Sequence, residues 1–219
     1  MSSINILEAI VAKSKLSKKE TAKQQKIVES AIALFAEKGY SNTSTSEIAK
    51  KSGVAEGTIF RHYGTKENLL LSVIAPFLKE SMPDLAKDLR EEVNPDNNTR
   101  FEDFIESLIR NRLNFLKANR EIFRVVIKEL LYRDELRYDL FPHIGKEMSA
   151  FIGNAINDYK ARGELADIPN DQLIRMILST IGSQFVVRFV LSPETNADNE
   201  EREIESLVRF IVYGVSARD

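Results

Sequence analysis

The chain has 219 residues, of which 43% are hydrophobic, and its formal net charge at pH 7 is −2. This length and apolar content suffice for a packed core in one or two domains. The sequence has no cysteine, which excludes a disulfide framework, a thiolate nucleophile and a cysteine-based zinc site, and agrees with a reducing cytoplasm.

Charge is unevenly distributed along the chain. Between Lys13 and Lys66 there are eleven lysines or arginines against five acidic residues, so the remainder of the chain carries an acidic excess. This distribution is expected when a DNA-binding module is joined to a domain that does not bind DNA.

The residues before the central motif leave several interpretations open. Ile4 to Ala12 is a short apolar stretch with helical spacing, which fits an extra packed helix, a disordered tail or a binding segment. Six lysines follow between Lys13 and Lys26, and they suit either an arm along DNA or a solvated helix face. The first long helix is predicted to begin at Ser17 or Thr21, both capping-box candidates, and to end before Gly39.

The central motif has the pattern of a helix-turn-helix followed by a third helix. Ser44 and Glu47 form a capping box that starts the first helix, and Gly53 provides the permissive backbone of the tight turn. The second helix, about Ala55 to Tyr63, buries Ile59 and leaves polar side chains outside. This arrangement is typical of a recognition helix that enters the major groove of DNA.

The motif resembles the amino-terminal domain of the TetR family of bacterial transcriptional repressors, over about Lys23 to Val73. The residues that carry the resemblance are Ile48-Ala49, Gly53-Val54, Gly57-Thr58, His62 followed by an aromatic residue, and Lys66-Glu67-x-Leu69-Leu70. The resemblance implies an all-α fold, in which a three-helix DNA-binding head precedes a larger helical body, with about nine or ten helices in all. We therefore expect an amino-terminal extension at 1–16, the DNA-binding domain at 17–72 and an effector-binding and dimerisation domain at 73–219.

The resemblance and the polar side chains of the motif predict contacts with double-stranded DNA. The predicted contact residues are Thr45, Ser46, Glu56, Gly57, Thr58, Phe60, Arg61, His62, Tyr63 and Lys66. Arg61 is the candidate for recognising guanine or binding a phosphate. Glu56 is the candidate for accepting a hydrogen bond from cytosine or for capping its own helix. Phe60 departs from the family, which usually has a tyrosine that holds a phosphate there. The hydroxyl of Tyr63 is expected to regain that contact, and Lys66 to remain free for a phosphate.

The rest of the chain shows helical periodicity without strand-like alternation, and Pro76 and Pro83 predict a kink or break between Ala75 and Asp84. In the family, the body encloses a pocket for a small effector, and a mostly apolar lining favours a hydrophobic or amphipathic ligand. Residues at helical spacing also fit an ordinary core. The candidates for the pocket are Phe104, Leu108, Arg112, Phe115, Phe123, Ile127, Phe151 and Phe185.

The last two predicted helices have wide apolar faces. Such faces suit the four-helix interface by which the family dimerises, although they also fit an intramolecular core. The predicted interface residues are Ile181, Phe189, Ile204, Leu207, Val208, Ile211 and Val215. The most apolar stretch, Ile174 to Leu191, contains Arg175 and Arg188, which are costly in lipid, so we predict no membrane span.

The sequence offers no catalytic pattern. Its two histidines, His62 and His143, have no carboxylate three residues before them, as a helical di-metal site requires, and no glycine-rich phosphate loop occurs. We expect no enzymatic activity, metal or cofactor. The predicted function is a cytoplasmic homodimer that binds a palindromic operator, represses transcription and is released by a small apolar ligand. The alternative is a helix-turn-helix protein without a small-molecule effector, regulated by a protein partner or by its concentration.

Overall fold

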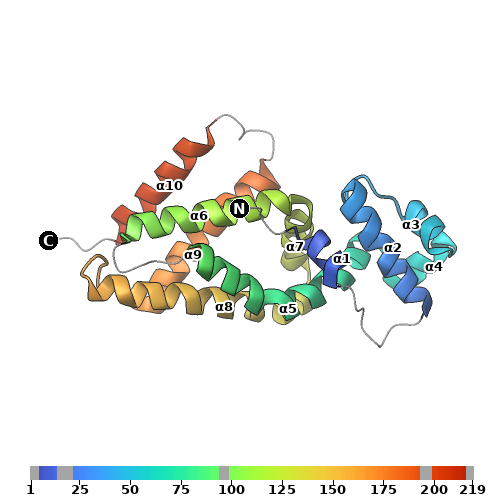
Figure 1. The fold of residues 1–219 in the computed structure, drawn as a ribbon, viewed down its shortest axis with the longest axis horizontal. Helices are drawn as coiled ribbons and strands as arrows, with labels where there is room; N and C mark the ends of the chain where they lie inside the picture. Colours follow the sequence, from blue (N-terminus) through green and yellow to red (C-terminus); the bar gives the residue numbers. More distant parts are fainter. Residues whose placement is uncertain (1–4, 14–21, 94–98, 193–198, 216–219) are drawn as a thin grey trace. The chain divides into compact units, whose positions relative to one another are not determined.

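The computed structural model describes residues 5–13, 22–93, 99–192 and 199–215, with side chains except at 11–13, 79–86, 135–137 and 139–148. These residues form ten α-helices and one π-helical turn (Figure 1), which confirms the predicted all-α fold. The helices are α1 (Ile6–Lys13), α2 (Ala22–Lys38), α3 (Thr45–Ser52), α4 (Glu56–Tyr63), α5 (Lys66–Glu92), α6 (Phe101–Ala118), α7 (Arg120–Tyr132), α8 (Asp134–Ala161), α9 (Asn170–Val186) with the π-helical turn Val187–Leu191, and α10 (Glu200–Val215).

The chain divides into two compact units. The amino-terminal unit comprises Met1–Glu80 and Ala118–Tyr132, and the bundle unit comprises Ser81–Lys117 and Arg133–Asp219. The chain passes from the first unit to the second within α5, and it returns between α6 and α7. Helix α7 therefore belongs with the amino-terminal helices, although it is distant from them in the sequence.

Helix α5 is continuous through both of its prolines. It runs from Lys66 to Glu92, so a break between Ala75 and Asp84 is wrong, whereas the alternative of a kink stays a prediction. A proline removes one backbone donor and crowds the preceding turn, which can bend a helix without ending it.

In the amino-terminal unit, α2 is the central helix, with Ile27, Ala31 and Phe35 at most 1% exposed. Helices α1 and α3 both pack against it (Figure 1). The backbone N–H of Ile6 in α1 donates to Oδ1 of the buried Asn119 at 2.7 Å, just before α7. From Ile6 onward, the apolar stretch is thus a packed helix of this unit. The predicted capping residues Ser17 and Thr21 lie outside the described residues.

In the bundle unit, aromatic rings fill the core between α6 and α8. The ring centroid of Phe104 lies 5.9 Å from that of Phe151 and 5.7 Å from that of Tyr159, and Phe101 lies 5.3 Å from Tyr159. All four residues are buried. Phe104, Phe151 and the buried Leu108, expected in a pocket, therefore pack as core residues.

The eight predicted pocket residues do not all belong to one unit. Phe123 and Ile127 lie on α7 of the amino-terminal unit, whereas the other six lie in the bundle unit. Phe185 is buried and its ring centroid lies 6.4 Å from that of Phe189. Arg112 and Phe115, on α6, are half-buried.

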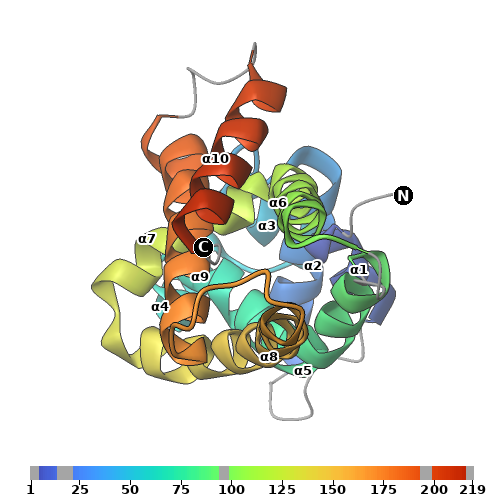
Figure 2. The same ribbon diagram turned by 90° about the vertical axis from the view of Figure 1, so that its left-hand side faces the viewer.

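Helices α9 and α10 lie side by side (Figures 1 and 2) and turn their apolar faces to their own unit. The dimer interface predicted on these faces is wrong for six of its seven residues, because each of the six is at most 6% exposed within a single chain. These six are Ile181, Phe189, Ile204, Val208, Ile211 and Val215. The seventh, Leu207, is half-buried and borders a cavity of about 170 Å³ with Ile109 and Leu113 of α6.

The opposite faces of these two helices expose large apolar side chains. Phe210 and Tyr213 on α10 are 70% and 67% exposed, and Met176 and Val187 on the α9 stretch are 50% and 43% exposed. We call these four residues the α9/α10 outer face. A groove of about 400 Å³ lies on the same side of the two helices, bordered by Thr180 and Phe210 among others.

Among the described residues, one helical stretch, Asn170–Leu191, is long and apolar enough to cross a membrane by length and composition. Its Leu173, Ile177 and Phe185 are buried in the bundle unit. Arg188 within it forms ion pairs of 2.6 Å with both Glu200 and Glu203 of α10.

Candidate nucleic-acid interface

Helix α3 begins at the predicted capping box. The Oγ of Ser44 accepts from the backbone N–H of Glu47 at 3.2 Å, and Oε2 of Glu47 accepts from the N–H of Ser44 at 2.9 Å. Gly53 ends the helix with φ of 70°, a left-handed conformation that favours glycine. The capping box and the turn are confirmed, and they place Thr45 and Ser46 in the first turn of α3.

Helix α4 is anchored by one residue and otherwise faces solvent. Ile59 is 1% exposed, whereas Glu56, Gly57, Phe60, Arg61 and His62 are exposed. Thr58 and Tyr63 are half-buried. A Cβ built at Gly57 would meet no atom within 4 Å, so the packing of the protein itself does not require glycine at this position.

Two predicted DNA-contact residues bond to each other. The hydroxyl of Thr45 donates to Oε1 of Glu56 at 2.5 Å, which links the amino-terminal ends of α3 and α4. The N-cap residue of α4 is Ala55, and it makes no side-chain capping hydrogen bond. Thr45 therefore cannot donate the same proton to a phosphate while this bond is formed, although its oxygen can still accept.

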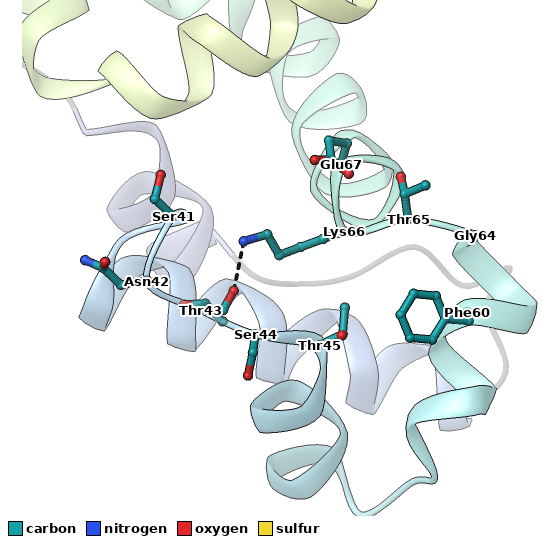
Figure 3. A pocket seen from close by; sticks show the side chains of 10 residues that line it. All are labelled: Ser41, Asn42, Thr43, Ser44, Thr45, Phe60, Gly64, Thr65, Lys66 and Glu67. Carbon is teal, nitrogen blue, oxygen red and sulfur yellow. Dashed lines mark hydrogen bonds between the residues drawn. The ribbon is translucent and has the colours of Figure 1, made fainter.

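An open groove of about 530 Å³ lies where α3, the end of α4 and the start of α5 meet (Figure 3). Its lining includes hydroxyl groups from Ser44, Thr45 and Thr65, together with the ring of Phe60. Phe60 is 48% exposed, so the position where the family usually has a tyrosine is accessible at the rim of this groove.

Lys66 is not free, contrary to the prediction. Its ammonium group donates to the backbone carbonyls of Tyr40 at 3.0 Å and Thr43 at 2.9 Å, the second of which is drawn in Figure 3. It also lies 4.2 Å from the centroid of the Tyr40 ring, a cation–π distance. Lys66 thus fixes the α2–α3 loop to the start of α5.

The prediction for Tyr63 is half right. Its aromatic ring is half-buried, as expected, but its hydroxyl oxygen is buried and therefore cannot meet a phosphate from solvent. The carbonyl of Tyr63 accepts from Nδ2 of Asn68 at 2.6 Å, and Oγ1 of Thr65 caps α5 by accepting from the N–H of Asn68 at 3.1 Å. Tyr63 is therefore part of the α4–α5 turn.

The α2–α3 loop is also held from α7. Oε2 of Glu121 accepts from the N–H of Tyr40 at 2.5 Å, and Oε1 accepts from the N–H of Ser41 at 3.3 Å. A Cβ at Gly39, whose φ is 84°, would lie 3.1 Å from Oε2 of the same carboxylate. Sequence reasoning missed Glu121, because some eighty residues separate it from the loop and no local pattern marks the pair.

The region around this interface matches a known family. Residues 27–73 match the model of bacterial regulatory proteins of the tetR family. The HTH-type transcriptional regulator YerO of Bacillus subtilis is 29% identical over 145 residues, which cover 60% of this chain and 50% of YerO. The chain thus spans about half the length of that relative. YvkB, another HTH-type regulator of Bacillus subtilis, is 24% identical to this chain. The similarity covers 88% of this chain and 97% of the length of YvkB.

Solved structures of regulators share the fold of the whole chain. FadR from Bacillus subtilis in complex with stearoyl-CoA has a TM-score of 0.57 and 22% identity, over 87% of this chain and 98% of that chain. A transcriptional regulator from Saccharomonospora viridis in complex with choline has a TM-score of 0.60 and 20% identity. The match covers 91% of this chain and 100% of that chain. Residues 27–73 are thus similar to the DNA-binding domain of the tetR family of helix-turn-helix transcriptional regulators, and the solved structures share the fold of most of the chain.

Proposed function

We propose that the chain acts in the cytoplasm as a homodimeric repressor that inserts its two α4 helices into the major grooves of a palindromic operator. The observation that carries the proposal is the exposed polar face of α4, presented by a helix that Ile59 anchors in the core. Arg61 on this face is proposed to read guanine, since its guanidinium can donate to both O6 and N7 of that base.

Gly57 supports this assignment. A glycine inside an exposed helix costs about 1 kcal/mol relative to alanine, and no atom of the protein would obstruct a side chain at this position. The requirement for a small residue is therefore proposed to come from DNA that approaches the helix closely. The groove beside Phe60 is proposed to take a backbone phosphate, because the amino-terminal end of α3 favours an anion there.

The homodimer is proposed to form through the α9/α10 outer face, where Phe210 and Tyr213 are exposed. The effector is proposed to be a small hydrophobic or amphipathic molecule bound in the bundle unit. FadR from Bacillus subtilis was solved with stearoyl-CoA and the Saccharomonospora viridis regulator with choline, which supports a small molecule as the kind of ligand.

A second candidate is a DNA-binding regulator without a small-molecule effector. The closely packed rings of Phe101, Phe104, Phe151 and Tyr159 favour it, because side chains already occupy that part of the bundle core. Thermal stabilisation across a panel of amphiphiles would separate the candidates, since a ligand that binds only the folded state raises the melting temperature.

The first test is capture of genomic DNA fragments by the purified protein, followed by sequencing. We expect a shared palindromic site whose affinity falls about tenfold to a hundredfold in Arg61→Ala, because a bidentate contact to guanine is lost. Arg90→Ala, at an exposed position on α5, is the matched control and should leave the site unchanged. Capture without a common sequence, equal for both variants and abolished by moderate salt, would overturn the proposal.

A further inference from the structure

Helix α6 carries an arginine in a row of residues that is otherwise apolar. Phe101, Phe104 and Leu108 follow one another at helical spacing and are at most 3% exposed. Arg112 and Phe115 continue the same row at i+4 and i+7 from Leu108, and both are half-buried. Burial lowers the pKa of the Arg112 guanidinium to about 10, while Glu92 opposes this shift. The arginine is therefore held where its charge is poorly hydrated.

Nearby arginines of the bundle unit are paired with carboxylates. Arg110, two residues away on α6, contacts Glu106 at 2.7 Å and Glu201 at 2.5 Å. Arg188 contacts two glutamates of α10 at 2.6 Å each. This pairing is the usual way in which a protein offsets the desolvation of a guanidinium.

Arg112 lacks such a pair. Among the side chains that the structure describes, no carboxylate lies within ion-pair distance of it. Its Nε donates to Oδ1 of Asn111 at 2.9 Å, and its guanidinium carbon lies 5.0 Å above the ring of Phe115. The charge of Glu92 raises the pKa of Arg112, but the carboxylate of Glu92 accepts a hydrogen bond from the side-chain amide of Asn111 and not from Arg112.

We infer that Arg112 is the anion-recognising residue of the effector site, so the effector is an anionic amphiphile. A carboxylate or phosphate would accept the remaining N–H donors of the guanidinium in fork geometry. The apolar chain of the ligand would pack against the half-buried ring of Phe115. This inference rests on the proposed ligand-responsive function, and it favours an acyl compound over a cationic ligand such as choline.

The test uses the full-length protein and four twelve-carbon probes, namely dodecanoate, dodecanoyl-CoA, dodecyltrimethylammonium and dodecanol, each below its micellar concentration. Thermal stabilisation and release of the captured operator are measured with each probe. We expect the two anionic probes to stabilise the protein and to release DNA, with dodecanoate or dodecanoyl-CoA the stronger according to whether a carboxylate or a phosphate is recognised. In Arg112→Met the half-saturating concentration of the anionic probes should rise about tenfold to a hundredfold.

Two controls separate recognition from a structural role. Arg110→Met, on the same helix, should leave the half-saturating concentration unchanged because its guanidinium already binds carboxylates. Without ligand, Arg112→Met should melt at a higher temperature than the wild type, since a desolvated unpaired charge is removed. If Arg112→Met fails to fold, Arg112→Lys keeps the charge but loses the planar fork, and it should show an intermediate affinity.

Equal responses of wild type and Arg112→Met to the anionic probes, or a preference for the cationic or neutral probe, would overturn the anion site. These outcomes are distinct from a failure of the proposed function. Specific operator binding without ligand is measured in the same series. Its absence would overturn the proposed function as a transcriptional regulator.

Discussion

At the scale of single residues, Glu47 links the start of α3 to α2. Its carboxylate accepts from the backbone and hydroxyl of Ser44, and it forms an ion pair of 2.8 Å with Lys38. The hydrogen bond from Lys38, followed by those from Ser44, lowers the pKa of Glu47 to about 2 from an ordinary value of 4.5. The ionised form of Glu47 is therefore favoured by folding.

This shift predicts a pH dependence of stability. Because the folded pKa is lower than the unfolded one, the contribution of Glu47 is present above about pH 4.5 and is lost as the pH falls towards about 2. Denaturant unfolding of wild type and Glu47→Gln between pH 6 and pH 2.5 should show a wild-type advantage that shrinks on acidification. Glu29→Gln, exposed on α2, is the control. A difference between wild type and Glu47→Gln that stays constant with pH would contradict the prediction.

At the scale of elements, the α2–α3 loop is fixed by side chains from two other helices. Lys66 of α5 binds its carbonyls, and Glu121 of α7 binds the N–H groups of Tyr40 and Ser41. The loop leads directly into Ser44 and Thr45, at the groove proposed for phosphate. The position of the first turn of α3, where DNA contact is proposed, thus depends on α7, the helix through which the chain returns from the bundle unit.

Glu121→Ala should therefore lower both the free energy of unfolding and operator affinity. The part-buried N–H of Tyr40 would lose a charged acceptor, which costs about 1–3 kcal/mol, and the exposed N–H of Ser41 would lose its acceptor as well. Glu121→Gln keeps one carbonyl acceptor and should lose less, and Arg124→Ala, exposed on the same helix, should change neither quantity. Urea unfolding and operator titration measure the two effects. Unchanged DNA binding by a destabilised Glu121→Ala protein would show that the hydrogen bonds of Glu121 to the α2–α3 loop stabilise the fold without affecting DNA binding.

At the scale of the whole molecule, the outer surface of α9 and α10 is unusual for an isolated chain. Phe210 and Tyr213 on α10 are largely exposed, and Phe210 borders a groove that Thr180 of α9 also lines. Exposed apolar surface beside a groove is typical of interaction sites. Operators with two-fold symmetry match regulators with two-fold symmetry, so a second copy of the chain is the expected partner.

Phe210→Lys should therefore convert the proposed dimer into a monomer, because a charge would replace an apolar ring in the proposed interface. Sedimentation velocity should show the mass of one chain, and affinity for the full palindrome should fall to that for a half-site. Tyr132→Lys, at an exposed aromatic residue of α7, is the matched control. A dimer that survives Phe210→Lys would place the interface elsewhere.

The sequence alone determined the helix-turn-helix. The capping box of Ser44 and Glu47, the left-handed Gly53 and the buried Ile59 are local features, since each depends on residues a few positions apart. The all-α fold was predicted from the helical periodicity of the chain together with the resemblance of the motif to the TetR family. The individual DNA contacts, the effector and the dimer remain predictions, because they concern partners outside the chain.

Only the tertiary structure decided which side chains were already engaged. Lys66 binds Tyr40 and Thr43, and Glu121 binds the same loop, through contacts between residues 23 to 81 positions apart. Likewise, the periodicity of α10 identified a buried stripe, but it did not show whether the same chain or a partner covers Val208. Helical spacing fixes which side chains share a face, whereas the element that packs on that face depends on long-range contacts that local sequence does not encode.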